Sequence, residues 1–170
     1  MKKIARFEKV SFDQFKKDWI DTFNSHDNIE EIYDSIILPK RATMYSAGYD
    51  FFSPLTFTLK PNETIKIPTG IKAFMEPGWV LKCYPRSGLG FKYRLQLNNT
   101  VGIIDGDYYN NENNEGHIFA KITNDSNESK TLSIEKGQGF IQGIFVEFGI
   151  TIDDESSQIR KGGFGSTSKK

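Results

Sequence analysis

The segments Thr56-Phe-Thr-Leu-Lys60 and Thr64-Ile-Lys-Ile67 decide the fold class. Polar and apolar residues alternate in both, and the turn residues Pro61-Asn-Glu63 lie between them. Because successive side chains of a strand point to opposite faces, this alternation predicts two strands that each bury one face. We therefore expect a β-hairpin at this position.

Further short segments of the same kind follow, separated by turns rich in Gly, Pro and Asn. They cover residues 71–75, 79–84, 117–123, 131–134 and 140–148. Fourteen phenylalanines and seven tyrosines also favour strands over a helical bundle. The sequence thus predicts an all-β fold, a jelly-roll-like sandwich or barrel.

The N-terminal region has a helical pattern instead. Its apolar residues recur at the spacing of one helix face, at Phe12, Phe15, Trp19 and Phe23. The candidate N-cap is Ser11 or Asp13. Mixed charges on the polar side favour a helix that packs on the body or on a neighbouring subunit over one that lies on a membrane. A second short helix is expected between residues 24 and 35.

These patterns divide the chain into three regions. We expect an N-terminal extension with an amphipathic helix over residues 1–38, a β core over residues 39–158 and a flexible C-terminal arm over residues 159–170. The core is of the size that one domain commonly has.

Composition limits the class of partners and the compartment. Twenty-two basic residues balance twenty-two acidic ones, which argues against a surface for nucleic acid. No apolar run approaches the about 18 residues that span a bilayer, and the N-terminus lacks the apolar run of a signal peptide. The single cysteine, Cys83, lies in an apolar run, which favours a buried structural thiol. We expect a cytoplasmic protein without membrane contact.

The turn Asn99-Thr-Val-Gly-Ile-Ile-Asp-Gly-Asp-Tyr-Tyr109 carries an amide, a carboxylate and a tyrosine close together. Asp105 follows the apolar part of the turn, with Tyr108 after it and Asn99 before it. Such a cluster could hold a small polar ring and a reactive water. An exposed hairpin turn would have the same composition, so the turn alone leaves both interpretations open.

Two other segments carry residues suited to phosphate. In Pro85-Arg-Ser-Gly88, a short helix that begins near Ser87 would point free amides toward an anion, beside the charge of Arg86. The C-terminal segment Arg160-Lys-Gly-Gly-Phe-Gly-Ser-Thr167 combines glycines with a guanidinium, two hydroxyls and an aromatic ring. This suits a triphosphate that carries a base, although a Gly/Ser tail with an incidental phenylalanine explains the segment equally well.

Five segments together resemble the motifs of the trimeric dUTP pyrophosphatases, or dUTPases, including those of phages and Gram-positive bacteria. In the family's order they are Ser46-Ala-Gly-Tyr-Asp50, Pro85-Arg-Ser-Gly88, Gly102-Ile-Ile-Asp-Gly-Asp-Tyr108, Gly137 to Gln142 and Arg160 to Thr167. The resemblance covers about residues 42–167. It implies the jelly-roll-like dUTPase fold, a homotrimer with shared sites, and hydrolysis of dUTP to dUMP and pyrophosphate.

The resemblance also implies roles at the nucleoside. Asp105 would orient and activate the water that attacks the α-phosphorus. Asn99 would pair with the uracil edge, together with backbone groups of Gly102, Ile103 and Ile104. Tyr108 would lie under the deoxyribose and leave no room for a ribose 2′-hydroxyl.

Further roles concern the triphosphate. The implied phosphate contacts in the core are Arg86, Ser87, Gly88 and Gln142. The implied contacts in the arm, which closes over the nucleotide, are Arg160, Phe164, Gly165, Ser166 and Thr167, with the Phe164 ring on the uracil. Asp50 would hold, through water, a Mg²⁺ that clamps the triphosphate.

The chain departs from the family pattern at several places. The family usually has arginine at the position of Gly139 and alanine at the position of Ile141, and Arg160 is one residue closer to the following glycines than in the commonest form. The polar run 109–115 is an insert, and the extension before Pro39 exceeds the minimal enzyme.

Two alternatives stay open. A dCTP deaminase shares the fold, but the pairing of Asp105 with Tyr108 favours a dUTPase. A regulatory protein partner could dock on the insert at Asn110 to Asn114 or on the helix from Phe12 to Phe23. A solvated loop and a packed helix are the simpler interpretation of these two elements.

Overall fold

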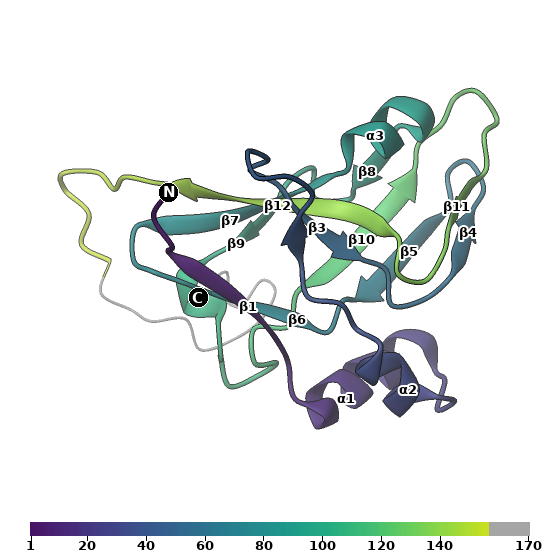
Figure 1. Cartoon of the computed structure of the whole chain (residues 1–170), viewed down its shortest axis with the longest axis horizontal. Coiled ribbons are helices and arrows are strands. Elements are labelled where there is room, and N and C mark those ends of the chain that lie inside the picture. Colours follow the sequence, from purple (N-terminus) through teal and green to yellow (C-terminus); the bar gives the residue numbers. More distant parts are fainter. Residues whose placement is uncertain (157–170) are drawn as a thin grey trace.

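The computed structural model describes residues 1–156 and is mostly β, with helices near the N-terminus (Figure 1). The strands are β1 (Ala5–Lys9), β2 (Lys40–Arg41), β3 (Tyr49–Phe52), β4 (Phe57–Leu59), β5 (Thr64–Pro68), β6 (Ile71–Met75), β7 (Trp79–Pro85), β8 (Leu95–Leu97), β9 (Gly102–Ile104), β10 (Phe119–Asn124), β11 (Leu132–Ile134) and β12 (Gly139–Glu147). The helices are α1 (Phe12–Phe23), α2 (Ile29–Asp34), α3 (Ser87–Tyr93) and the 3₁₀ turn η1 (Gly106–Tyr108).

The strands form several antiparallel sheets. The largest has the order β2-β3-β12-β7-β9, and a second has the order β5-β10-β8. The pairs β1-β6 and β11-β4 complete the set. The long strand β12 crosses the middle of Figure 1 and pairs with both β3 and β7, so that Gln142 lies opposite Asp50 on one side and Tyr84 on the other.

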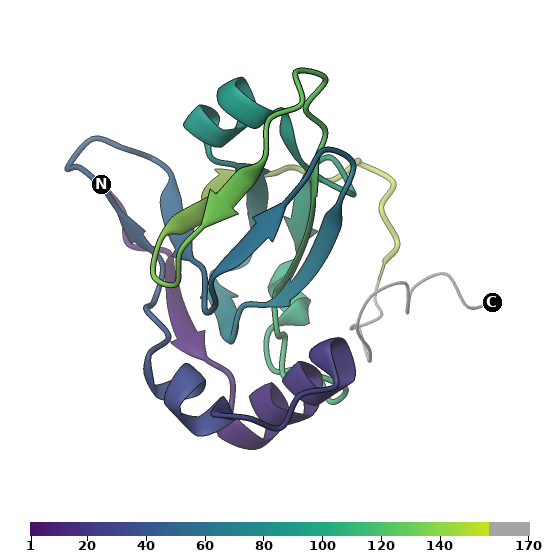
Figure 2. The ribbon, with the colours of Figure 1, turned by 90° about the vertical axis from the view of Figure 1, so that its right-hand side faces the viewer.

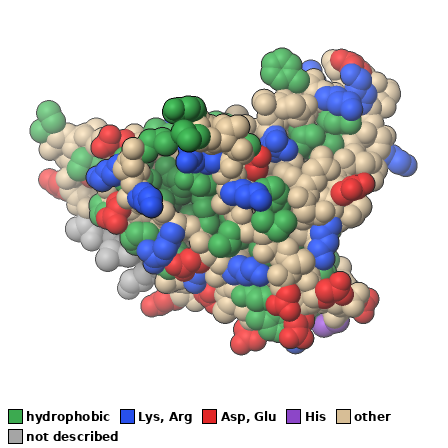
Figure 3. All heavy atoms as spheres, in the orientation of Figure 1, with side chains coloured by type: hydrophobic (Ala, Val, Ile, Leu, Met, Phe, Trp, Pro, Cys, Tyr) green, Lys and Arg blue, Asp and Glu red, His purple; other side chains and the backbone are tan. Residues whose placement is uncertain are grey.

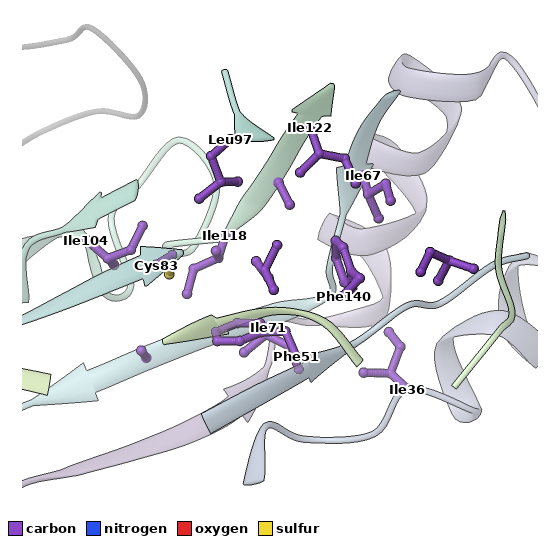
Figure 4. Packing of buried hydrophobic residues seen from close by; sticks show 14 of the residues in the cluster. Ile36, Phe51, Ile67, Ile71, Cys83, Leu97, Ile104, Ile118, Ile122 and Phe140 are labelled. Carbon is purple, nitrogen blue, oxygen red and sulfur yellow. The ribbon is translucent and has the colours of Figure 1, made fainter. Parts of the chain in front are cut away.

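One continuous apolar core fills the space between the sheets. Phe51 of β3, Ile67 of β5, Ile122 of β10 and Phe140 of β12 are at most 1% exposed, and Figure 4 shows them directed toward a common interior. Burial of one such side chain contributes about 1.5–3 kcal/mol, so this shared core holds the separate sheets together.

The predicted hairpin is wrong in its pairing. Strand β4 pairs with β11, whereas β5 pairs with β10. Asn124 joins the two at a corner, because its carbonyl accepts from the Asn62 N–H at 2.7 Å and its side-chain amide donates to the Leu59 carbonyl at 2.8 Å. The alternation itself is confirmed, since Phe57, Leu59 and Ile67 are buried.

The remaining strand predictions from residue 71 onward are confirmed within a few residues, but five strands were not predicted: β1, β2, β3, β8 and β9. Strand β1 matters most for the architecture. It pairs with β6 from Ala5 opposite Met75 to Lys9 opposite Ile71, so part of the expected extension belongs to the β structure.

The two predicted N-terminal helices are both present, and Figure 2 shows them together below the strands. Of the two predicted caps it is Ser11 that caps α1, because its side chain accepts from the Gln14 N–H at 3.2 Å. Phe15 and Trp19 bury the inner face of α1 in the common core. Helix α1 is therefore packed on the body of the protein.

The outer side of this helical corner is acidic. Asp and Glu side chains gather over it in Figure 3, and the exposed Glu30, Glu31 and Asp34 belong to α2. Among the described residues, none of the helices is long and apolar enough to cross a membrane.

Candidate functional site

An ion pair joins two of the predicted residues on the largest sheet. The Arg86 Nε lies 3.1 Å from the Asp50 Oδ1, and the Asp50 side chain is only 18% exposed. Gln142 lies directly opposite Asp50 on β12, and its side-chain amide donates to the Pro85 carbonyl at 3.2 Å. We call Asp50, Arg86 and Gln142 the Arg86 cluster; it combines a positive charge with amide donors and one carboxylate.

Two glycines make room for the Arg86 cluster. A Cβ at Gly48 would lie 2.5 Å from the Gln142 Oε1, and a Cβ at Gly139 would lie 3.1 Å from the Arg86 Nη1. The Arg86 guanidinium also donates to the Gly139 carbonyl at 3.4 Å. The glycine at position 139, a departure from the family pattern, thus provides the space over which Arg86 lies.

Helix α3 begins at Ser87, as the sequence predicts, with Arg86 at its N-cap. The Arg86 carbonyl accepts from the N–H groups of Leu89 and Gly90, both at 3.0 Å. Ser87 and Gly88 are exposed, and a Cβ at Gly88 would meet nothing within 4 Å. The chain's own packing therefore does not require glycine at position 88, whereas close approach of a ligand would.

Asp105 lies at the end of β9 and precedes η1, in extended conformation with φ of −77° and ψ of 156°. Its carbonyl accepts from the Tyr108 N–H at 3.1 Å, which closes the turn. The residue contributes to a cleft of about 580 Å³ that is mainly apolar. The other lining residues are Phe74, Met75, Glu76, Pro77, Gly78, Trp79, Gly106, Asp107 and Phe148.

The residues predicted to contact a base lie on the segment before Asp105. Asn99 is exposed, and its side-chain amide makes no hydrogen bond to any described residue. Ile103 is 52% exposed while Ile104 is 6% exposed, as the alternation of a strand requires. A Cβ at Gly102 would lie 3.1 Å from the Cys83 Cβ, so this glycine is needed for packing of β9 on β7.

Cys83 itself is buried, as predicted, with 3% exposure. Burial raises the pKa of its thiol to about 12, so the thiol is protonated near neutral pH and is a poor nucleophile.

Tyr108 is 4% exposed and is held by partners that the sequence did not reveal. Its hydroxyl donates to the His117 carbonyl and accepts from the Asn114 side-chain amide, both at 2.8 Å. The Asn111 amide donates to the Tyr108 carbonyl, also at 2.8 Å. Two of these partners, Asn111 and Asn114, lie in the Asn-rich insert, whose composition indicated a polar loop but no contact with Tyr108.

Asp105 and the Arg86 cluster lie far apart within one chain. Ile104 is opposite Leu81 on β7, and Arg86 lies just beyond the other end of that strand. Along β7, the rise of a strand from Leu81 to Arg86 is about 17 Å. Across the sheet, β9, which precedes Asp105, and β3, which carries Asp50, are three strand spacings or about 14 Å apart. The separation is thus on the order of 20 Å, too far for one phosphorus atom to contact both.

The predicted arm residues Arg160, Phe164, Gly165, Ser166 and Thr167 lie outside the described residues. The structure therefore leaves their predicted roles untested.

Comparisons with known proteins identify the class in agreement with the fold and the five motifs. A dUTPase structure from Streptococcus mutans is 37% identical, with a TM-score of 0.63 over 87% of this chain and 98% of that chain. The dUTPase of Staphylococcus bacteriophage 80alpha has a TM-score of 0.64 at 20% identity, over 97% of this chain and 98% of that chain, and so supports the fold. Fold and motifs together define a mostly β nucleotide hydrolase.

The family follows from two further matches. The dUTPase family profile matches residues 34–168. The deoxyuridine 5′-triphosphate nucleotidohydrolase of Lactococcus lactis is 47% identical over 134 residues, which are 78% of this chain and 88% of that protein. The chain belongs to the dUTPase family.

Proposed function

We propose that Asp105 is the residue that activates water in this enzyme, which hydrolyses dUTP to dUMP and pyrophosphate. The observation that carries the proposal is the position of Asp105, at the end of a short strand and beside a cleft, within a family match that spans most of the chain. The water oxygen forms a bond to the α-phosphorus while the bond from that phosphorus to the bridging oxygen breaks. Pyrophosphate leaves, and the water proton passes to the Asp105 carboxylate.

Recognition of the nucleoside is assigned to the segment from Asn99 to Tyr108. The Asn99 amide offers both a donor and an acceptor to a uracil edge, and backbone groups of Gly102, Ile103 and Ile104 complete the slot. A thymine methyl would clash in a slot of this kind. Tyr108 lies under the deoxyribose in this proposal and excludes a 2′-hydroxyl.

The triphosphate is assigned to Arg86, Ser87, Gly88 and Gln142. The charge of Arg86, the exposed start of α3 and the open space at Gly88 support this assignment. The predicted arm contacts Arg160, Phe164, Gly165, Ser166 and Thr167 would complete the site from the C-terminus.

A Mg²⁺ ion fits the residues present only as a companion of the substrate. Among residues 1–156, no three His, Cys, Asp or Glu side chains come together as a metal site. Asp50 supplies one carboxylate, already paired with Arg86, so it would hold the ion through water while phosphate oxygens supply most ligands. When bound, the ion would offset the negative charge of the triphosphate.

We further propose that the protein acts as a homotrimer with the jelly-roll-like dUTPase arrangement. The separation of about 20 Å between Asp105 and the Arg86 cluster supports this, because two chains can bring together what one chain holds apart. The balanced charge of the chain gives no support for a nucleic-acid partner. No specific observation favours a regulatory protein partner, since the insert directs Asn111 and Asn114 inward.

The test is pyrophosphate release from dUTP, dTTP, dCTP and UTP in the presence of Mg²⁺. We expect release from dUTP alone. Ammonia released from dCTP, with no pyrophosphate from dUTP, would instead establish the deaminase alternative.

A further inference from the structure

The insert after Tyr108 is folded around that residue. Asn111 donates to the Tyr108 carbonyl and Asn114 donates to the Tyr108 hydroxyl, both at 2.8 Å. The same hydroxyl donates its proton to the His117 carbonyl at 2.8 Å. The backbone and the side chain of Tyr108 are therefore both held by residues of one short loop.

The loop is itself tightly cross-linked. The Asn111 Oδ1 accepts from the N–H groups of Asn113 and Asn114, at 3.0 and 3.2 Å. The Asn114 Oδ1 accepts from the Asn111 amide at 2.8 Å and from the Gly116 N–H at 3.1 Å. Gly116 has a φ of +81°, and a Cβ there would lie 2.5 Å from the Tyr108 carbonyl oxygen. The loop therefore needs these particular residues to close on Tyr108.

The N-terminal extension braces the loop from outside. The Glu115 carboxylate accepts from the Ser11 N–H at 2.9 Å and from the Ser11 hydroxyl at 2.5 Å, and Lys72 pairs with it at 3.3 Å. Partial burial raises the pKa of Glu115, but the hydrogen bonds from Ser11 and Lys72 outweigh it and hold that pKa below its ordinary value of 4.5. The Tyr109 hydroxyl donates to Glu8 of β1 at 2.7 Å.

We propose that this loop, residues 109–116, is a clamp that positions Tyr108 against the sugar, and that Asn114 thereby sets the preference for deoxyribose over ribose. The inference rests on the proposed function, in which Tyr108 lies under the sugar. The Tyr108 ring can exclude a ribose 2′-hydroxyl only if the ring resists displacement, and side chains in packed protein interiors resist displacement strongly. Two hydrogen bonds on the phenolic oxygen fix the depth and the tilt of the ring, so their loss lets the ring yield to a ribose.

The test compares two isosteric substitutions in the same loop. Asn114→Asp keeps the oxygen that accepts from Asn111 and Gly116, but it replaces the donor to Tyr108 with an acceptor. Asn113→Asp introduces the same charge at an exposed residue whose only hydrogen bond among the described residues comes from its backbone N–H. Tyr108→Phe removes the hydroxyl and keeps the ring.

The measured quantity is the ratio of kcat/KM for dUTP to kcat/KM for UTP. We expect Asn114→Asp and Tyr108→Phe each to lower this ratio by about tenfold, mainly through a lower KM for UTP, as loss of a buried hydrogen bond allows. The double variant should show little change beyond Tyr108→Phe, because a phenyl ring no longer has the hydroxyl with which residue 114 interacts. Asn113→Asp should keep the wild-type ratio.

Equal losses of kcat/KM on both nucleotides in Asn114→Asp would mean a merely structural role and would overturn the proposal. So would an unchanged ratio in Tyr108→Phe, which decides the matter alone if Asn114→Asp does not fold. Calorimetry with the non-hydrolysable α,β-imido analogues of dUTP and UTP gives the ratio of their dissociation constants, which measures the sugar preference without catalysis. A wild type that hydrolyses no dUTP would refute the proposed function, whereas the binding ratio would still support or overturn the clamp.

Discussion

Activity should return when two differently disabled chains assemble into one trimer. Asp105→Asn removes the proposed general base, and Arg86→Ala removes a phosphate contact about 20 Å away in the same chain. Alone, each substitution should lower turnover by a factor on the order of 10² or more. If a site combines Asp105 of one chain with Arg86 of another, mixed trimers must contain some intact sites.

The size of the recovery follows from the geometry of a ring. With equal amounts of the two chains and random assembly, about three quarters of the trimers contain both variants. Each mixed ring holds roughly one intact site in three, because an intact Asp105 faces an intact Arg86 only once around it. The unfractionated mixture should therefore regain about a quarter of the wild-type turnover, and mixed trimers purified through both tags about a third of it.

The assay is pyrophosphate release from dUTP by co-expressed chains that carry two different affinity tags and are purified through both. The separate variants, mixed after purification without subunit exchange, serve as the control and should stay inactive. A doubly tagged preparation that is no more active than the sum of the two variants would refute the argument, since it would place the whole site within one chain.

Three further substitutions test the fold and the site. Phe15→Ala empties a fully buried position and should lower the free energy of unfolding by about 3–5 kcal/mol in denaturant titrations at fixed protein concentration. The control, Lys16→Ala at an exposed position, should change it little. A loss below about 1 kcal/mol would mean that packing of α1 contributes little to the stability of the core. Glu115→Gln should lower the free energy of unfolding by a constant amount above about pH 5.5, and by less as the pH falls. The reason is that the pKa of this carboxyl is lower in the folded than in the unfolded state, so its stabilisation is present above the unfolded pKa and is lost as the pH falls through the folded pKa. A loss of stability that grows toward acid pH would contradict this. Gly139→Arg restores the usual family residue. It should nevertheless raise the KM for dUTP, because the new side chain would lie close to the Arg86 guanidinium. An unchanged KM would show that Arg86 has room to move.

The sequence predicted local structure well where a single periodicity decided it. The spacing of Phe15 and Trp19 indicated α1, and Ser11 capped it as its side-chain chemistry suggested. Pairing was less predictable, because the alternation around Phe57 and Ile67 says which face of each strand is buried but not which strand lies beside it. Asn124, distant in sequence, binds both segments where they separate, a contact that no local pattern predicts.

For the candidate site too, the sequence indicates residues but not their arrangement in space. Motifs in the family's order point to Asp105 and Arg86 as candidates, and their chemistry suits a nucleotide. The distance between them within one chain does not follow from their order, because it depends on the register of β7 against β9 and on the position of Arg86 beyond the end of β7.

The insert had the weakest sequence signal, yet it contacts the residue assigned to the sugar, and the N-terminal extension contacts the insert in turn. A run of asparagines has no periodicity, and the same composition fits a solvated loop. Its meaning comes from direction: Asn111 and Asn114 turn toward Tyr108, while Glu115 turns toward Ser11 at the start of α1. Both departures from the minimal enzyme therefore meet in the loop that holds Tyr108, so a change in either one is expected to affect sugar selection before it affects the phosphate contacts of the Arg86 cluster.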